Sequence, residues 1–435
     1  MKKKLPLVTI AEPEEAAALN GLSLETTVAL ADLASAVKDG LLGFCADVGL
    51  VVMRQMLDAE MTIRVGAKHA KLTERSANWH GSTTGPVVLG GRQLSVKRPR
   101  GRTTDGREVE LDAWAAFSST DLLDQLTVER MLAGVATRRH VDVAEPLSSE
   151  IDDKAKGAGR SSVSRRWKRA TEHALAEMMA RDLSGLDVAV IMIDGLHIAD
   201  QCCVVALVIC ADGRKVPVGL WLGDTENKTV VTGLLSEVVS RGLSADGGLL
   251  VVIDGAKALA AGVKKVFGDQ ALVQRCTLHK RRNLKDHLPD ELGRKMDWRL
   301  AQAFNNPDPA KGLDATRRII AELRADHPDA AASLAEGLED MFTVRRLGIE
   351  GRLALTFTNT NCIESMISIA RTTMRNVKRW QDGSMKKRWM AAGMLEAERS
   401  FRRVRGCKQM PTLVAAIRSH AGLEVTPPNY DQAAA

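Results

Sequence analysis

Two apolar runs of this chain end in the same three residues, Ile-Asp-Gly, at 193–195 and 253–255. An aspartate that closes a buried strand, followed by a glycine that permits a tight turn, presents a carboxylate at the edge of a sheet. A third acid, Glu364, lies 110 residues beyond Asp254. The pattern predicts a sheet whose edge carries several carboxylates.

The segment from 187 to 273 has the pattern of an α/β domain. Three apolar runs are joined by short polar turns, and a helix-length stretch leads to two further runs. We expect strands at Val188–Ile193, Cys202–Cys210, Val216–Leu222, Leu249–Ile253 and Ala271–Val273, and a helix at Lys228–Arg241. This order matches the ribonuclease H-like fold, whose first and fourth strands are parallel neighbours. Asp194 and Asp254 would then meet at one sheet edge.

Composition excludes membrane and disulfide-rich classes. The 435 residues are 45% hydrophobic and 26% charged, as in globular proteins, and no apolar run approaches the length of a membrane span. The initial Met-Lys-Lys-Lys lacks a following signal segment, so we expect a cytoplasmic or nucleoid-associated protein without membrane contact. The seven cysteines form no paired framework and are expected to be reduced.

Outside the α/β segment, helical spacing dominates. Residues 14–72 and about 120–140 are expected to be helical, and 277–352 shows no strand pattern. Between the first two helical stretches, turn-forming residues at 80–86 precede Val87–Leu89, Gly90-Gly91 and an alternating run, which predicts a hairpin. A short strand is expected at Glu108–Leu111, a turn or linker at 151–159, and a disordered tail from Pro427.

Positive charge is concentrated near the end of the chain. Residues 371–408 contain twelve basic and three acidic residues, a net charge of +9 in a chain whose total is +7. With Trp380 and Trp389 interleaved, we favour a phosphate-binding surface over a solvated helix face. Either tryptophan could stack on an unpaired base or belong to the core.

A second basic segment, Arg160–Ala170, follows a turn and is dense in arginine. Such a short helix resembles the second helix of a helix-turn-helix, although an ordinary surface helix has the same composition. Its position just before the acid-bearing segment favours DNA binding. The candidate DNA-binding residues are Arg98, Arg100, Arg160, Arg165, Arg166, Lys168, Arg169, Arg371, Arg375, Lys378, Arg379 and Trp380.

Three carboxylates together suit a hard cation. A lone Asp-Gly usually only forms a turn, and Glu364 would complete a capping box if Asn361 capped its helix. However, Glu364 begins a polar stripe that continues through Arg371 and Arg375, opposite an apolar face. Mg²⁺, which Mn²⁺ can replace, prefers oxygen ligands, and two such ions about 4 Å apart promote phosphoryl transfer. We therefore predict that Asp194, Asp254 and Glu364 are the catalytic and metal-binding residues.

Cys276 and His279 have the spacing of half a zinc site. A structural zinc needs two more ligands, and His287 is the only candidate nearby. A core cysteine with a hydrogen-bonded histidine close to the acids is the favoured interpretation.

Several of these motifs together resemble the Mutator-type transposases of bacterial insertion sequences. The resemblance rests on Asp194-Gly195, Asp254-Gly255, the Cys276/His279 pair and the Asn361/Glu364 pair, and extends to Leu89–Arg100 and Met131–Arg139. It covers about residues 50 to 405. Where relatives tend to have an Arg-Asn-Gly-type segment, this chain has Asn78–Gly81.

The resemblance implies a ribonuclease H-like catalytic core, interrupted by a helical insertion, with a Mg²⁺-dependent Asp-Asp-Glu triad at Asp194, Asp254 and Glu364. It also implies binding of double-stranded DNA at terminal inverted repeats through the N-terminal region, 3′-end cleavage, strand transfer into target DNA and a homodimer on DNA. Cys276 and His279 would support the active site. The alternatives are a catalytically inactive DNA-binding protein and a ribonuclease H-type nuclease without strand transfer.

The expected chain is a multidomain α/β plus α protein. Its segments are an N-terminal helical region at 1–75, a small basic β-hairpin module at 76–118, a helical, helix-turn-helix-like DNA-binding region at 119–185, the first part of the core at 186–275, a helical insertion at 276–355, the completion of the core with the Glu364 helix and basic helices at 356–408, and a C-terminal tail at 409–435.

Overall fold

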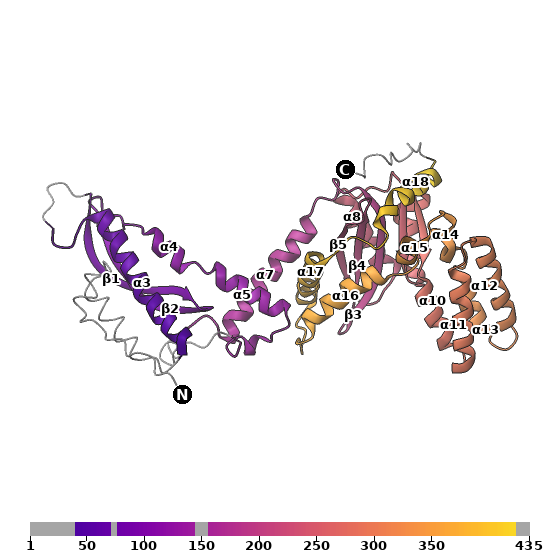
Figure 1. Ribbon diagram of the computed structural model, residues 1–435, viewed down its shortest axis with the longest axis horizontal. Coiled ribbons are helices and arrows are strands. Elements are labelled where there is room, and N and C mark those ends of the chain that lie inside the picture. Colours follow the sequence, from indigo (N-terminus) through magenta and orange to yellow (C-terminus); the bar gives the residue numbers. More distant parts are fainter. Residues whose placement is uncertain (1–39, 71–75, 144–154, 423–435) are drawn as a thin grey trace, which may run out of the picture. The chain divides into compact units, whose positions relative to one another are not determined.

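A computed structural model describes residues 40–70, 76–143 and 155–422, which form a mixed α/β structure (Figure 1). The chain divides into two compact units, one ending at Ala170 and the other beginning at Thr171. Within the described ranges, no helix combines the length and apolar character that a membrane crossing requires. The expected linker residues 151–154, the tail from Pro427 and the helix expected before residue 40 lie outside the described residues.

The first unit is built on a helix packed against a hairpin. Helix α3 (Gly40–Val65) lies on strands β1 (Ala77–Leu89) and β2 (Arg92–Thr103), which pair antiparallel. Buried side chains of the helix and hairpin fill the space between them, including Leu57 and Met61. The predicted Gly90-Gly91 turn is confirmed, since both glycines have positive φ (56° and 74°).

Several predicted boundaries in this unit are wrong. Residues 80–86 belong to β1 rather than to a turn. Residues 82–86 pair with β2, and a bulge between Trp79 and Ser82 accommodates residues 80 and 81 within the strand. Glu108–Leu111 forms only an isolated bridge at Glu108 instead of a strand. Helix α3 ends at Val65, seven residues before the expected end.

The later helices of the first unit are also bounded differently from the prediction. The helix expected at 120–140 ends early, because Gly134 has a φ of 81°. The basic helix expected over 160–170 runs for 21 residues. The helical elements are α4 (Asp112–Ser118), α5 (Asp121–Leu132), η1 (Thr137–Arg139) and α7 (Arg160–Ala180), whose residues fall on both sides of the division between the two units.

The second unit contains a five-stranded mixed sheet in the order β5-β4-β3-β6-β7. Its first three strands form an antiparallel meander, and the last two add in parallel. The predicted strand order and the parallel pairing of the first and fourth strands are confirmed. The strands are β3 (Val188–Ile198), β4 (Gln201–Cys210), β5 (Lys215–Gly223), β6 (Leu249–Ile253) and β7 (Ala271–Arg275).

Both faces of this sheet are covered by helices. One face carries Ile191, Ile193 and Val204 and packs against α8 (Lys228–Ser240) and α9 (Lys257–Phe267). Helix α16 (Asn361–Met374) contacts β3, and α17 (Gly383–Ser400) contacts β5. Because helices cover both faces, β4 is apolar and buried along nearly its whole length, whereas β7 contains the buried polar residues Gln274 and Arg275. The remaining elements here are η2 (Gly268–Gln270), η4 (Cys407–Gln409) and α18 (Met410–His420).

Between β7 and α16 the chain is helical, as predicted. These helices enclose an apolar cluster of their own, in which Phe304 and Phe342 have ring centroids 5.5 Å apart. The group appears in Figure 1 beside the sheet, in orange tones. The elements are α10 (Thr277–Asp286), α11 (Asp290–Phe304), α12 (Pro309–Leu323), α13 (Pro328–Ala335), η3 (Glu339–Phe342), α14 (Thr343–Arg346) and α15 (Gly351–Phe357).

Replacing Gly393 of α17 by alanine tests the close approach of α16 and α17. The added methyl group would stand 2.6 Å from the backbone Cα of Ala370, so the helices would have to separate. We expect the free energy of unfolding to fall by about 2 kcal/mol in urea titrations. Gly185→Ala is the control, because its methyl group would meet nothing within 4 Å. Equal stability of the two variants would contradict this packing.

Candidate active site

The parallel pairing of β3 with β6 places two of the predicted acids next to each other. The ladder pairs Ile193 with Ile253, so Asp194 and Asp254 follow directly on neighbouring strands. Strand β6 ends at Ile253, and the Asp254 carboxylate accepts a hydrogen bond from the Ala256 amide at 2.8 Å. This hydrogen bond holds the carboxylate at the carboxyl end of β6.

The tight turn predicted after Asp194 is wrong. Strand β3 continues four residues beyond Asp194 to Ile198, and the chain turns at Ala199, whose φ is 54°. The turn moves outward because β3 keeps pairing with β4 as far as Gln201. Gly195 is therefore a strand residue.

The absence of a side chain at Gly195 leaves space for the carboxylate of Glu226, a residue that the sequence analysis did not identify. A Cβ at Gly195 would lie 3.3 Å from Cδ of Glu226 and would overlap its Oε2. Burial, and then the charge of Asp254, raise the pKa of Glu226. Among the described residues no side chain forms an ion pair or hydrogen bond with it. The glycine after Asp194 was the available signal, but nothing in the sequence indicated which side chain would occupy its space.

Glu364 reaches the site from α16. The helix N-cap is Thr360 rather than Asn361, and the Thr360 hydroxyl donates to Oε1 of Glu364 at 2.6 Å. Glu364 thus holds a side-chain hydrogen bond in place of the reciprocal capping box. The predicted apolar face of α16 is buried, and Arg371 and Arg375 on the opposite stripe are exposed.

The acids influence each other electrostatically. Burial, followed by the negative charge of Asp254, raises the pKa of Asp194 to about 7, and Glu364 adds to the effect. The Gly195 amide, 2.9 Å from Oδ1 of Asp194, opposes the shift, as does His279. An aspartate in this position is half protonated near neutral pH unless a cation approaches it.

Cys276 and His279 lie beside Glu364 in a small network centred on Thr360. The Thr360 hydroxyl oxygen is 3.4 Å from Sγ of Cys276 and 3.3 Å from Nδ1 of His279. Nε2 of His279 is 3.9 Å from Oε1 of Glu364. Since the hydroxyl has one proton and its bond to Glu364 is the shortest, Nδ1 of His279 serves as a donor to Thr360.

The charges in this network fit that assignment. Its hydrogen bond with Cys276 raises the pKa of His279 to about 9, against the opposing effect of burial. Burial works against ionisation of the Cys276 thiol, yet hydrogen bonds with His279 and Thr360 lower its pKa. His279 is therefore a cation at neutral pH, and the negative charge of Glu364 contributes to the rise of its pKa. The pair forms no zinc site with His287 in this structure.

The donor set fits a hard divalent cation by its chemistry. Asp194, Asp254, Glu226 and Glu364 supply only oxygen atoms, and no described lysine or arginine forms an ion pair with them. However, no three acid, histidine or cysteine side chains in the described residues lie close enough together to hold one ion as they stand. Binding an ion would require the carboxylates to rotate toward one another.

The predicted DNA-binding residues fall into two groups. Four of them are held by acids: Arg98 and Arg100 contact Glu108, and Arg166 and Arg169 contact Asp124. The others are exposed cations, apart from one partly buried tryptophan, and are Arg160, Arg165, Lys168, Arg371, Arg375, Lys378, Arg379 and Trp380.

The two tryptophans in the basic C-terminal segment belong to one packed pair. Trp389 is buried, and the Trp380 ring meets it edge-on with centroids 6.4 Å apart. This arrangement places Trp389 in the core, which settles one of the two alternatives for that residue. Trp380 is partly exposed.

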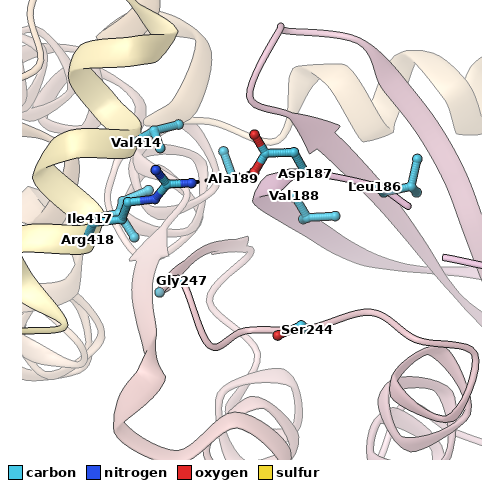
Figure 2. A pocket seen from close by; sticks show the side chains of 10 residues that line it. Leu186, Asp187, Val188, Ala189, Ser244, Gly247, Val414, Ile417 and Arg418 are labelled. Atoms are coloured by element: carbon cyan, nitrogen blue, oxygen red, sulfur yellow. Dashed lines mark ion pairs between the residues drawn. The ribbon is translucent and has the colours of Figure 1, made fainter. Parts of the chain in front are cut away.

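A cavity of about 220 Å³ in the second unit lies away from the acids (Figure 2). It is lined by residues that precede β3 and β6, at the strand ends opposite Asp194 and Asp254. Figure 2 shows Arg418 of α18 approaching Asp187, an ion pair of 3.8 Å. This cavity is a gap beneath α18 and is separate from the carboxylates.

Asp194→Asn tests the environment of that carboxylate through pH. Between about pH 4 and 7 the native state retains a proton that the unfolded chain has released, so stability falls as pH rises. Without divalent metal, the wild type should lose about 3 kcal/mol relative to Asp194→Asn between pH 5 and pH 8. Urea unfolding at both pH values measures this difference. The exposed Asp246→Asn is the control, and parallel pH profiles for wild type and Asp194→Asn would refute the assignment.

Known proteins resemble this chain over most of its length. Residues 22–403 match the family model described as "Transposase, Mutator family". The chain is 30% identical over 205 residues to the transposase for insertion sequence element IS6120 of Mycolicibacterium smegmatis, covering 46% of this chain and 62% of that relative. It is 24% identical to the IS905 transposase of Lactococcus lactis (75% of this chain, 82% of the relative). For the ISRM5 transposase of Rhizobium meliloti the identity is 25% (77% and 82%). This chain therefore belongs to the Mutator family of transposases.

Proposed function

We propose that this protein is the DNA transposase of an insertion sequence, which binds terminal inverted repeats and catalyses metal-dependent 3′-end cleavage and strand transfer. The observation that carries the proposal is the parallel pairing of Ile193 with Ile253, which brings Asp194 and Asp254 together beside Glu364. The strand order supports a ribonuclease H-like core, and the helices between 276 and 355 would be an insertion within it.

In this proposal each residue has a distinct task. Asp194, Asp254 and Glu364 would hold Mg²⁺ or Mn²⁺, and the bound metal would supply activation of a water or a 3′-hydroxyl and stabilisation of the departing oxygen. Thr360 would orient Glu364 through its hydrogen bond, and the positive charge of His279 would lie beside that carboxylate. The buried apolar sheet beneath Asp194 excludes water from one side of the site.

The proposed partner is double-stranded DNA, both the element's ends and the target. The exposed cations of α7, α16 and the segment after α16 supply positive charge that phosphates require. Joining two ends to one target favours a homodimer on the DNA. The protein would then act at the nucleoid in the bacterial cytoplasm.

Asp254→Asn tests the proposed chemistry. The amide keeps the shape but removes the negative charge, so Mg²⁺-dependent cleavage and joining should fall by at least about 1,000-fold. Binding of terminal-repeat DNA should change less than threefold. Purified protein and labelled DNA ends, scored on denaturing gels, give both quantities. Asp246→Asn, at an exposed loop, should behave as wild type.

The outcomes separate the alternative functions. Cleavage without joined products by the wild type would indicate a ribonuclease H-type nuclease. Specific binding without cleavage by either protein would indicate a DNA-binding protein without catalytic activity. Equal cleavage by wild type and Asp254→Asn would remove Asp254 from the active site.

Thr360→Val tests the positioning of Glu364. The variant lacks the hydroxyl that donates to Oε1 at 2.6 Å, so cleavage should slow by about tenfold. The Mg²⁺ concentration for half-maximal rate should also rise, which a purely structural role would not cause. Thr360→Ser retains the hydroxyl and should recover most of the rate. Equal impairment of both variants would assign Thr360 to packing alone.

A further inference from the structure

The first unit contains a hollow of about 710 Å³ that no catalytic role explains. It lies between α3, the segment that follows α3, and the middle of the β1–β2 hairpin. Its volume is within the range of sites that hold a ligand the size of a nucleotide or larger. All residues that line it belong to the first unit, so the hollow does not depend on the second.

The backbone around the hollow is unusual in two places. The bulge between Trp79 and Ser82 bends β1 there, and a bulge redirects the side chains next to it. His69 has a φ of 65°, a left-handed conformation that is strained for a residue with a side chain. The indole nitrogen of Trp79 donates to the Gly66 carbonyl at 2.7 Å and fixes the ring in the wall.

Positively charged side chains outnumber negatively charged ones in the lining of the hollow. Its acid, Asp58, lies 4.0 Å from Nζ of Lys68, and Arg98 pairs with Glu108 at 3.2 Å. Arg54 and Lys97 are exposed, and neither side chain forms a hydrogen bond or ion pair with another described residue. Two positive charges therefore remain without a counter-charge at the rim of one concave surface.

We propose that this hollow binds the phosphodiester backbone of duplex DNA, with Arg54 and Lys97 as its phosphate contacts. The inference rests on the proposed function and adds the place and mode of contact in the first unit. Lys68 already lies 4.7 Å above the Trp79 ring, so the indole is not free to stack on a base. Backbone contacts of this kind position DNA without reading its sequence.

The test uses the full-length chain and two labelled duplexes, one with the terminal repeat and one of unrelated sequence. Affinity is measured by fluorescence anisotropy between 50 and 200 mM salt for wild type and the double variant Arg54→Gln/Lys97→Gln. Each lost phosphate contact lowers the slope of log affinity against log salt by about 0.9. The expected change is a slope smaller by about 2, with affinity about 60-fold weaker at 0.1 M salt, for both duplexes.

Two matched variants control for charge and folding. Arg138→Gln/Lys156→Gln removes two exposed cations of the same unit whose side chains likewise form no ion pair with a described residue and do not line the hollow, and should change affinity far less. Arg54→Lys/Lys97→Arg preserves both charges and should bind like wild type. The midpoint temperature of thermal unfolding should be the same for every variant and the wild type, because all of the substituted side chains are exposed.

Three results would overturn the inference. Wild-type binding with an unchanged slope in Arg54→Gln/Lys97→Gln would show that the hollow does not contact DNA while leaving the proposed function intact. A loss confined to the terminal-repeat duplex would mean that these residues read bases. A wild-type chain that binds neither duplex would reject the proposed function together with the inference.

Discussion

The pairing of β3 with β6 is the constraint on which the candidate site depends. Parallel strands pair only after a crossover, here provided by β4, β5 and α8, so residues 60 positions apart become neighbours. The pairing is fixed because the paired residues of both strands, 190–193 and 250–253, are buried and a shift by one residue would reverse every side chain. The packing of the apolar core, rather than a local turn, therefore determines the positions of Asp194 and Asp254.

Glu364 depends on a different kind of support. An apolar face anchors its helix against the sheet. Thr360 and His279 contact its carboxylate, and these two residues come from opposite ends, in sequence, of the long helical segment. Cys276 begins that segment and Thr360 ends it. The helices at 277–357 are thus joined to the sheet at two points that meet beside the third acid.

The positions of the strands and the faces of α16 could be predicted from the sequence because each follows from local periodicity, whereas the strand pairing was predicted from the match of these elements to the ribonuclease H-like order. The bounds of β6 were predicted to the residue, whereas β3 was expected to end at Ile193 because the Asp-Gly pair that follows favours a turn. Pairing with β4 overrides that preference, and no periodicity reveals it. Thr360 and Glu226 could not be predicted, since their roles arise from contacts between segments far apart in the chain.

The contact between Gly195 and Glu226 illustrates how packing between distant segments limits which substitutions a position tolerates. The carboxylate of Glu226 occupies the volume that any side chain at position 195 would need. A larger residue at 195 therefore requires the Glu226 carboxylate to rotate away from the strand, position 226 to become smaller, or its loop to move. Among relatives that share this sheet, a side chain at position 195 should be accompanied more often by a shorter residue at position 226.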